Sequence, residues 1–303
     1  PVLGYAYAES RDGITWERPN LGIVDLPGAQ HQNALGAPTK CFGLFLFDEG
    51  HGYTPPAERF KMAYYRQKST QLPATGMWVA FSADGLRFDD PIGRPVIAEY
   101  AEGEAGGISD IVEGLWDPRR REYLVICKRW EAGHPGKPAN AKEGMRRVVG
   151  LTSSRDFRQW ENPVTIFRPA PENGLEEFYG CKPILRGDLY LGFLRVLRDD
   201  LPADEGGAVQ GIGWTELATS RDGRTWTRQP GKFLDRDPRP GEWDHAMAWF
   251  GDCVTVGDKE YIYYGGYSTG HKGGGRQLGL AILRRNGFVS RDADAGGAGA
   301  RAL

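Results

Sequence analysis

The chain has 303 residues, of which 26% are charged, and its net charge at pH 7 is −2. This balance argues against a nucleic-acid-binding protein, which needs a basic surface to neutralise phosphates. No apolar run approaches the roughly 18–20 residues that cross a bilayer, and no secretory leader is present at the start. Because the sequence begins with Pro1 inside a repeat unit, we expect a processed or truncated N-terminus, which leaves both a cytoplasmic and a secreted location open.

A short phrase recurs four times along the chain. Its aspartates are spaced by 72, 72 and 66 residues, and a weaker fifth copy, AILRRNGFVSRDA, spans 281–293. A regular internal period predicts a repeat architecture with one supersecondary unit per copy. The four clear copies are AESRDGITWERP (8–19, with Asp12), FSADGLRFDDP (81–91, Asp84), SSRDFRQWENP (153–163, Asp156) and TSRDGRTWTRQP (219–230, Asp222).

The residues of the phrase predict a hairpin. Asp-Gly favours a tight turn because glycine tolerates positive φ, and a serine two residues before each aspartate can hydrogen-bond the turn. An apolar stretch precedes the turn and an aromatic residue follows it, so each copy indicates strand, turn, strand and a ring that packs between units. We therefore assign the phrase to structure rather than to chemistry. The aromatic residues are Trp16, Phe88, Trp160 and Trp226.

Two further strands separate successive phrases, which gives four strands per unit. Their connecting turns contain Asp117-Pro118, Gly187-Asp188 and Gly257-Asp258. Helical periodicity is absent, and radial repetition protects the edges of short sheets. We therefore predict an all-β fold, a five-bladed β-propeller with four-stranded antiparallel blades, the first blade being incomplete at its N-terminus. It forms a single domain over residues 1–293, followed by a flexible tail at 294–303.

Propeller geometry also indicates where polar residues converge. The start of a blade's first strand and the end of its antiparallel second strand lie on one face, so we expect carboxylates and cations to meet there. Acids crowded into a half-desolvated pocket acquire divided pKa values, as acid–base catalysis requires. The candidates for catalysis are Asp110, Glu177 and Asp244, and those for substrate binding are His31, Asn33, Arg66, Arg129, Glu176, Arg195, His245 and His271.

Six stretches resemble the five-bladed β-propeller glycoside hydrolase superfamily (families 32, 43, 62, 68, 117 and 130). Together they cover nearly the whole chain and most resemble uncharacterised family-32-like bacterial propeller proteins. The stretches are SRDGITWERPNLG, GLWDPRRREYLVICKR, FYGCKPILRGDLYLGFL, SRDGRTWTRQPGKFL, WDHAMAWFGDCVTVGDKEYIYYGG and GLAILRRNGFVSRDA.

The resemblance implies a glycoside hydrolase acting on a small or terminal sugar at the axial mouth. It matches Asp110 to an inner-strand aspartate and Glu177 to the general acid one blade later. The first acid of the pattern should fall near HQNA, which contains only His31 and Asn33. Either the base is missing, or Asp244 supplies it, or it precedes Pro1.

Two other functions stay open at this point. One is a glycoside phosphorylase, in which phosphate replaces water, and the other is a non-catalytic carbohydrate-binding propeller. We expect a small-molecule carbohydrate as the partner, without nucleic acid or membrane, and the oligomeric state is not predicted. We expect no cofactor, with a structural or axial divalent cation such as calcium left open.

Overall fold

The structure is a computed structural model that describes residues 4–68, 74–99, 107–136 and 144–289. Regular structure within these ranges is β-strand, apart from two 3-10 turns, η1 (Pro56–Glu58) and η2 (Pro171–Asn173). None of the described helices is long and apolar enough to cross a membrane. The predicted tail at 294–303 lies outside the described residues.

The second and third repeat units each form one antiparallel four-stranded sheet, and their strands pair in sequence order. These sheets match the predicted blades. The second unit contains β1 (Cys41–Asp48), β2 (Phe60–Arg66), β3 (Gly76–Ser82) and β4 (Ile97–Ala98), and the third contains β5 (Val112–Asp117), β6 (Glu122–Ala132), β7 (Met145–Ser154) and β8 (Val164–Phe167).

The fourth and fifth units are joined into one seven-stranded sheet by a parallel bridge between Gly213 and Met247. We predicted separate blades here. The side chain of Trp249 binds the two units together, because its indole N–H donates to the carbonyl of Val196 across the junction at 3.1 Å. The strands are β9 (Glu177–Arg186), β10 (Leu189–Pro202), β11 (Gln210–Ser220), β12 (Thr227–Arg228), β13 (Met247–Val256), β14 (Lys259–Tyr267) and β15 (Arg276–Arg284).

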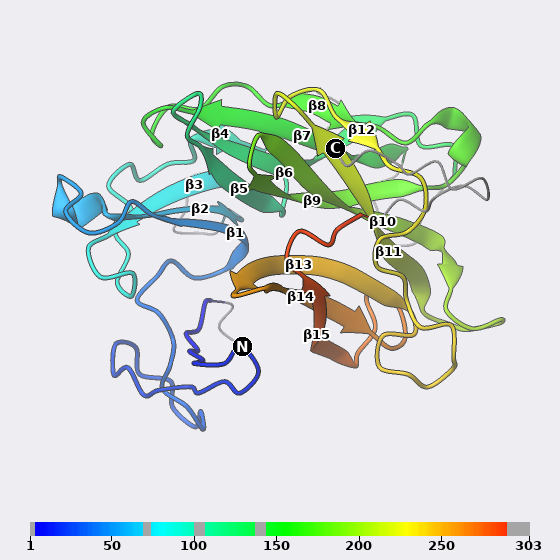
Figure 1. Cartoon of the computed structure of the whole chain (residues 1–303), viewed down its shortest axis with the longest axis horizontal. Coiled ribbons are helices and arrows are strands. Elements are labelled where there is room, and N and C mark those ends of the chain that lie inside the picture. Colours follow the sequence, from blue (N-terminus) through cyan, green and yellow to red (C-terminus); the bar gives the residue numbers. More distant parts are fainter. Residues whose placement is uncertain (1–3, 69–73, 100–106, 137–143, 290–303) are drawn as a thin grey trace.

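The first unit, residues 4–37, contributes only isolated bridges, which agrees with the predicted incomplete blade. It lies between the second and fifth units (Figure 1, blue). The Tyr5 hydroxyl donates to the carbonyl of Gly43 at 2.7 Å. On the other side, the Tyr263 hydroxyl donates to the carbonyl of Gly13, also at 2.7 Å. The described residues therefore form the five predicted units, with the fourth and fifth joined into one sheet.

The first strands of neighbouring units lie against one another, β1 on β5 and β5 on β9. This approach is closest at Gly43, where φ is +59°. A Cβ there would lie 2.7 Å from the amide nitrogen of Val112 and 2.9 Å from the carbonyl oxygen of Asp110, so only glycine fits. The contact sets the position of the backbone at Asp110, the first candidate acid.

The repeated phrase forms the predicted turn in all four copies. In the fourth copy, the Asp222 carboxylate accepts the backbone N–H groups of Arg224 at 2.8 Å and Thr225 at 2.7 Å, and the hydroxyl of Ser220 at 2.9 Å. Trp226 then packs on Phe167 of the preceding unit, with ring centroids 6.0 Å apart. The ring therefore packs between blades, as predicted.

The third copy carries Phe157 where the others have glycine. Phe157 adopts the same left-handed backbone conformation, with φ of +63°. Its ring is fully buried and lies 4.9 Å from the ring of Tyr123 and 6.1 Å from that of Phe81. Burial of the aromatic ring offsets the cost of positive φ for a residue with a Cβ.

We expect Asp222→Ala to lower the free energy of unfolding by about 1 kcal/mol, because two backbone N–H groups lose their acceptor. Partial burial acts to raise the pKa of Asp222, but the amides of Thr225 and Arg224 outweigh it and hold that pKa well below its usual value. The stabilisation should therefore be complete above about pH 4 and disappear as the pH falls through the lowered pKa.

Urea unfolding at pH 7 and pH 2.5 tests this, with Asp188→Ala as the control. The Asp188 side chain is 79% exposed and pairs only with exposed Arg221, so its loss should change stability by less than about 0.5 kcal/mol. Equal effects of the two substitutions would contradict the structural role of the phrase.

Candidate functional site

Asp110 lies just before β5 and forms an ion pair with Lys128 near the end of β6. The backbone fixes this pair, because the amide of Ser109 donates to the carbonyl of Lys128 at 2.8 Å. The Asp110 side chain is 31% exposed and that of Lys128 only 4%. Burial acts to raise the pKa of Asp110, but the Lys128 ammonium outweighs it and the pKa is lowered. Asp110 is therefore an ionised carboxylate that solvent can reach.

Glu177, the first residue of β9, is fully buried. Its carboxylate accepts the backbone N–H of Arg147 on β7 at 3.1 Å and forms an ion pair with the Arg147 guanidinium. The same guanidinium nitrogen contacts Asp199 of β10 at 3.2 Å. Burial raises the pKa of Glu177, and Arg147 only partly opposes it. Two carboxyls from different strands thus share one buried cation.

His271 follows β14 and reaches the same cluster. Its Nδ1 lies 3.1 Å from a carboxylate oxygen of Asp199. The ring is 3% exposed, and burial lowers its pKa more than Asp199 raises it. Gly211, with φ of +108°, allows this approach, because a Cβ there would overlap the Cβ of His271. We therefore assign His271 as a neutral imidazole at neutral pH.

Aromatic rings connect the two charged groups. Tyr179 of β9 stacks on Trp249 of β13 with centroids 4.7 Å apart and an interplanar angle of 27°. The Lys128 ammonium lies 4.4 Å from the centroid of Tyr179, and the His271 ring meets Tyr179 edge-on at 5.0 Å. The electrostatic influence of Asp110 also reaches the Tyr179 hydroxyl. Tyr179 therefore lies between the Asp110 pair and the Asp199–His271 pair.

Two neighbouring residues that the sequence could not separate face different ways. Glu176 accepts a hydrogen bond from the Asn173 amide at 2.9 Å and lies 3.4 Å from Arg228. Of these two glutamates, it is Glu177 whose carboxylate forms the ion pair with Arg147. Of the pair Glu176/Glu177, the residue that belongs to the cluster is therefore Glu177.

The predicted arginines have other partners. Arg129 extends to the Thr165 hydroxyl on β8 at 2.5 Å, so the cation beside Asp110 is its neighbour Lys128. Successive side chains of a strand point to opposite faces, so an error of one residue in the predicted register of β6 selects Arg129 in place of Lys128. Arg195 forms a buried ion pair with Glu113 of β5, where burial lowers the pKa of Arg195 to about 10.

The fifth unit places its candidates in a separate network. Asp244 accepts the Tyr264 hydroxyl at 3.2 Å, and no contact among the described residues joins it to Asp110 or Glu177. Both ring nitrogens of His245 are occupied, Nδ1 by the carbonyl of Asp237 at 2.9 Å and Nε2 by the carboxylate of Asp204 at 2.9 Å.

The remaining candidates lie in or beside the first unit. The Asn33 amide donates to the carbonyl of Tyr7 at 2.6 Å, and His31 is half-buried in the same segment. Arg66 donates to the carbonyl of Thr39 at 3.2 Å. The Asn33 contact connects two segments of the first unit, and the Arg66 contact holds the end of β2 against the segment that precedes β1.

Sequence reasoning did not select Lys128, Arg147, Asp199 or Trp249. One signal was available, because a lysine or arginine within an apolar strand is rarely buried without an acidic partner. As for a metal, the ranges that the structure describes contain no group of three or more His, Cys, Asp and Glu side chains that could hold one.

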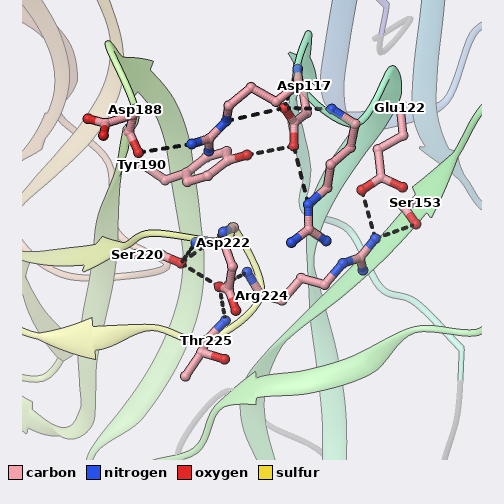
Figure 2. A network of polar contacts seen from close by, with 12 residues as sticks. Asp117, Glu122, Ser153, Asp188, Tyr190, Ser220, Asp222, Arg224 and Thr225 are labelled. Atoms are coloured by element: carbon pink, nitrogen blue, oxygen red, sulfur yellow. Dashed lines mark hydrogen bonds and ion pairs between the residues drawn. The ribbon is translucent and has the colours of Figure 1, made fainter.

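A cavity of about 600 Å³ lies at the opposite end of the blades, where β5 ends and β6 begins. Figure 2 shows a polar network at this end, in which Arg224 of the cavity donates to Glu122 at 2.8 Å and the Tyr190 hydroxyl donates to Asp117 at 2.5 Å. Asp117 also accepts the backbone N–H of Arg119 at 2.9 Å, which confirms it as a turn residue. The acids and cations of this end pair mainly with each other.

No protein-family model matches the chain, and no curated protein matches it. Several solved structures, by contrast, superpose on the chain. A thermostable family-43 glycoside hydrolase superposes with a TM-score of 0.61 and 16% identity, covering 94% of this chain and 84% of that one. The Bombyx mori family-32 β-fructofuranosidase gives a TM-score of 0.53 at 11% identity, covering 87% of this chain and 48% of that one.

A third similar structure is an N-acetylgalactosamine deacetylase from F. plautii in complex with blood group B trisaccharide. Its TM-score is 0.52 at 14% identity, and the match covers 91% of this chain and 79% of that one. At such identities the likeness establishes the fold alone. The chain has the five-bladed β-propeller fold of the family-43 and family-32 glycoside hydrolases.

Proposed function

We propose that the chain is a glycoside hydrolase that acts on a small or terminal sugar bound beside Asp110 and Glu177. The observation that carries the proposal is that the pKa values of these two carboxyls are shifted in opposite directions. The Lys128 ammonium lowers the pKa of Asp110, whereas burial raises that of Glu177. Pairs of acids whose environments push their pKa values apart are the acid and the charged partner of glycosidic cleavage.

In this reaction Glu177 protonates the departing glycosidic oxygen. Asp110 remains ionised and stabilises the positive charge that develops at the anomeric carbon. Tyr179, which lies against Lys128 and stacks on Trp249, supplies aromatic surface beside the Asp110 pair. A carbohydrate ligand for this chain is also supported by the similar deacetylase structure, which is in complex with a trisaccharide. Asp244 takes no part in the proposed reaction, because its carboxylate is bonded to Tyr264.

A second candidate is a glycoside phosphorylase. Lys272 is exposed, and its charge reaches both Asp110 and Lys128, so a phosphate ion would meet positive charge at this site. One assay decides among the candidates: turnover of a glycoside panel with and without inorganic phosphate. Hydrolysis in phosphate-free buffer supports the hydrolase, and strictly phosphate-dependent release supports the phosphorylase. Binding without turnover leaves a carbohydrate-binding propeller.

We expect Glu177→Gln to lower kcat/KM on a natural glycoside by about 10²–10⁴, because the transferable proton is lost. A nitrophenyl glycoside, whose leaving group needs little protonation, should lose much less. The wild-type rate should fall as the pH rises through the raised pKa of Glu177, and this basic limb should be absent in the variant. Steady-state kinetics against pH with both substrates measures these effects.

The matched control is Glu176→Gln, since the neighbouring carboxylate pairs with Asn173 and Arg228. We expect a loss of less than about tenfold, without dependence on the leaving group. Equal losses on both substrates for Glu177→Gln would remove Glu177 from the role of general acid.

We expect Asp110→Asn to reduce kcat by at least about 10² on natural and activated substrates alike. The positive charge at the anomeric carbon develops whatever the leaving group is, and an amide cannot stabilise it as a carboxylate does. Asp244→Asn provides the comparison, with an expected loss of less than about tenfold. If Asp244→Asn lowers kcat as much as Asp110→Asn does, Asp244 takes part in the reaction and the proposal is wrong on this point.

A further inference from the structure

We propose that His271 is the general base of this reaction and that Asp199 is its positioning residue. The proposal rests on the glycosidase function above and adds the group that activates water. It starts from a sequence fact: the segment HQNA, where the family resemblance calls for a first acid, contains no carboxylate. A different base is therefore needed if water is the nucleophile.

The hydrogen bond to Asp199 fixes the tautomer of His271. Asp199 is fully buried beside Arg147, and the Nδ1–H of His271 donates to its carboxylate at 3.1 Å. The lone pair therefore lies on Nε2, which makes no hydrogen bond to any residue that the structure describes. An acidic residue that orients the imidazole of a general base in this way is the arrangement of the catalytic triads.

A second His–Asp pair shows what a structural histidine looks like in this protein. His245 is equally buried, but its Nδ1 contacts a carbonyl oxygen and its Nε2 contacts the carboxylate of Asp204. No nitrogen of His245 is left to accept a proton from water. His271 differs from His245 in two respects: its Nε2 has no partner among the described residues, and its carboxylate partner Asp199 is fully buried, whereas the Asp204 side chain is 57% exposed.

Arg147 places the base near the acid. One nitrogen of its guanidinium contacts both Glu177 and Asp199, so the acid and the positioning residue are neighbours on a single cation. The groups that face His271 are Asp199 of β10, Arg147 of β7, Tyr179 of β9, Trp249 of β13 and its own neighbour Lys272, and the Arg276 side chain donates to the His271 carbonyl. Burial, Arg147 and Lys272 lower the pKa of His271 and Asp199 raises it, so the base form is present at neutral pH.

The proposed step is balanced. The water oxygen forms a bond to the anomeric carbon while Nε2 of His271 takes one water proton. The glycosidic C–O bond breaks, and the departing oxygen takes the proton of Glu177. His271 then releases its proton to solvent and Glu177 takes one back, so the net change is one glycoside and one water converted to one hemiacetal sugar and one alcohol. Direct attack by water inverts the anomeric configuration.

The test first requires that the wild-type chain hydrolyses a glycoside in phosphate-free buffer. If it does not, the proposed function fails and the base assignment fails with it. If it does, His271→Ala should lower kcat by about 10²–10⁴ with little change in KM. The loss should be the same for natural and nitrophenyl substrates, in contrast to Glu177→Gln, because the base acts on water and not on the leaving group.

Four further readouts separate a base from a structural residue. Azide needs no deprotonation, so it should restore much of the rate of His271→Ala and yield a glycosyl azide. The acid limb of the wild-type pH profile should disappear in that variant. Proton NMR of the first product should show inverted anomeric configuration. Asp199→Asn should lower kcat, and its rate should recover only when azide is added.

The control is His245→Gln, which removes an equally buried histidine from its contact with the more exposed Asp204. Its melting temperature measures the cost of such a loss, its pH profile should keep the wild-type shape, and azide should not raise its rate. The assignment is overturned if His271→Ala keeps wild-type kcat, if azide fails to restore its rate, or if the product retains its configuration.

Discussion

The guanidinium of Arg147 holds the candidate site together. It is a buried cation on β7 of the third unit, and it contacts Glu177 and Asp199 on the first two strands of the fourth. Removing Arg147 would leave the Asp199 carboxylate buried without its cation, and breaking a buried ion pair in this way typically costs about 3–5 kcal/mol. The position of Glu177, and through Asp199 that of His271, therefore depends on one side chain that joins two blades.

The fold makes this junction by bringing inner strands together. Gly43 lets β1 lie on the backbone around Asp110, and β5 in turn lies on β9. The ends of the blades then differ in chemistry. One end holds the ionised acid Asp110, the buried acid Glu177 and His271, whose Nε2 has no partner among the described residues, whereas acids and arginines surround the cavity at the other end.

The repeats made the fold predictable, because each copy of the phrase carries its own turn chemistry at Asp12, Asp84, Asp156 and Asp222. Asp110 and Glu177 were chosen as candidates because they occupy equivalent places in successive units. Register was harder to read. β6 and β7 are buried on both faces, so alternation between apolar and polar residues cannot show which of Lys128 and Arg129 faces Asp110. His271 lies in a loop whose path depends on contacts far away in sequence, and no local pattern gives its partner.

The most direct test of the account is a crystal structure of the chain soaked with mixed monosaccharides. We predict density for a sugar ring next to Asp110 and Glu177, with its anomeric carbon between the two carboxyls and His271 Nε2 facing it. A sugar bound only in the cavity at the opposite end, beside Arg120 and Arg224, would contradict the central claim.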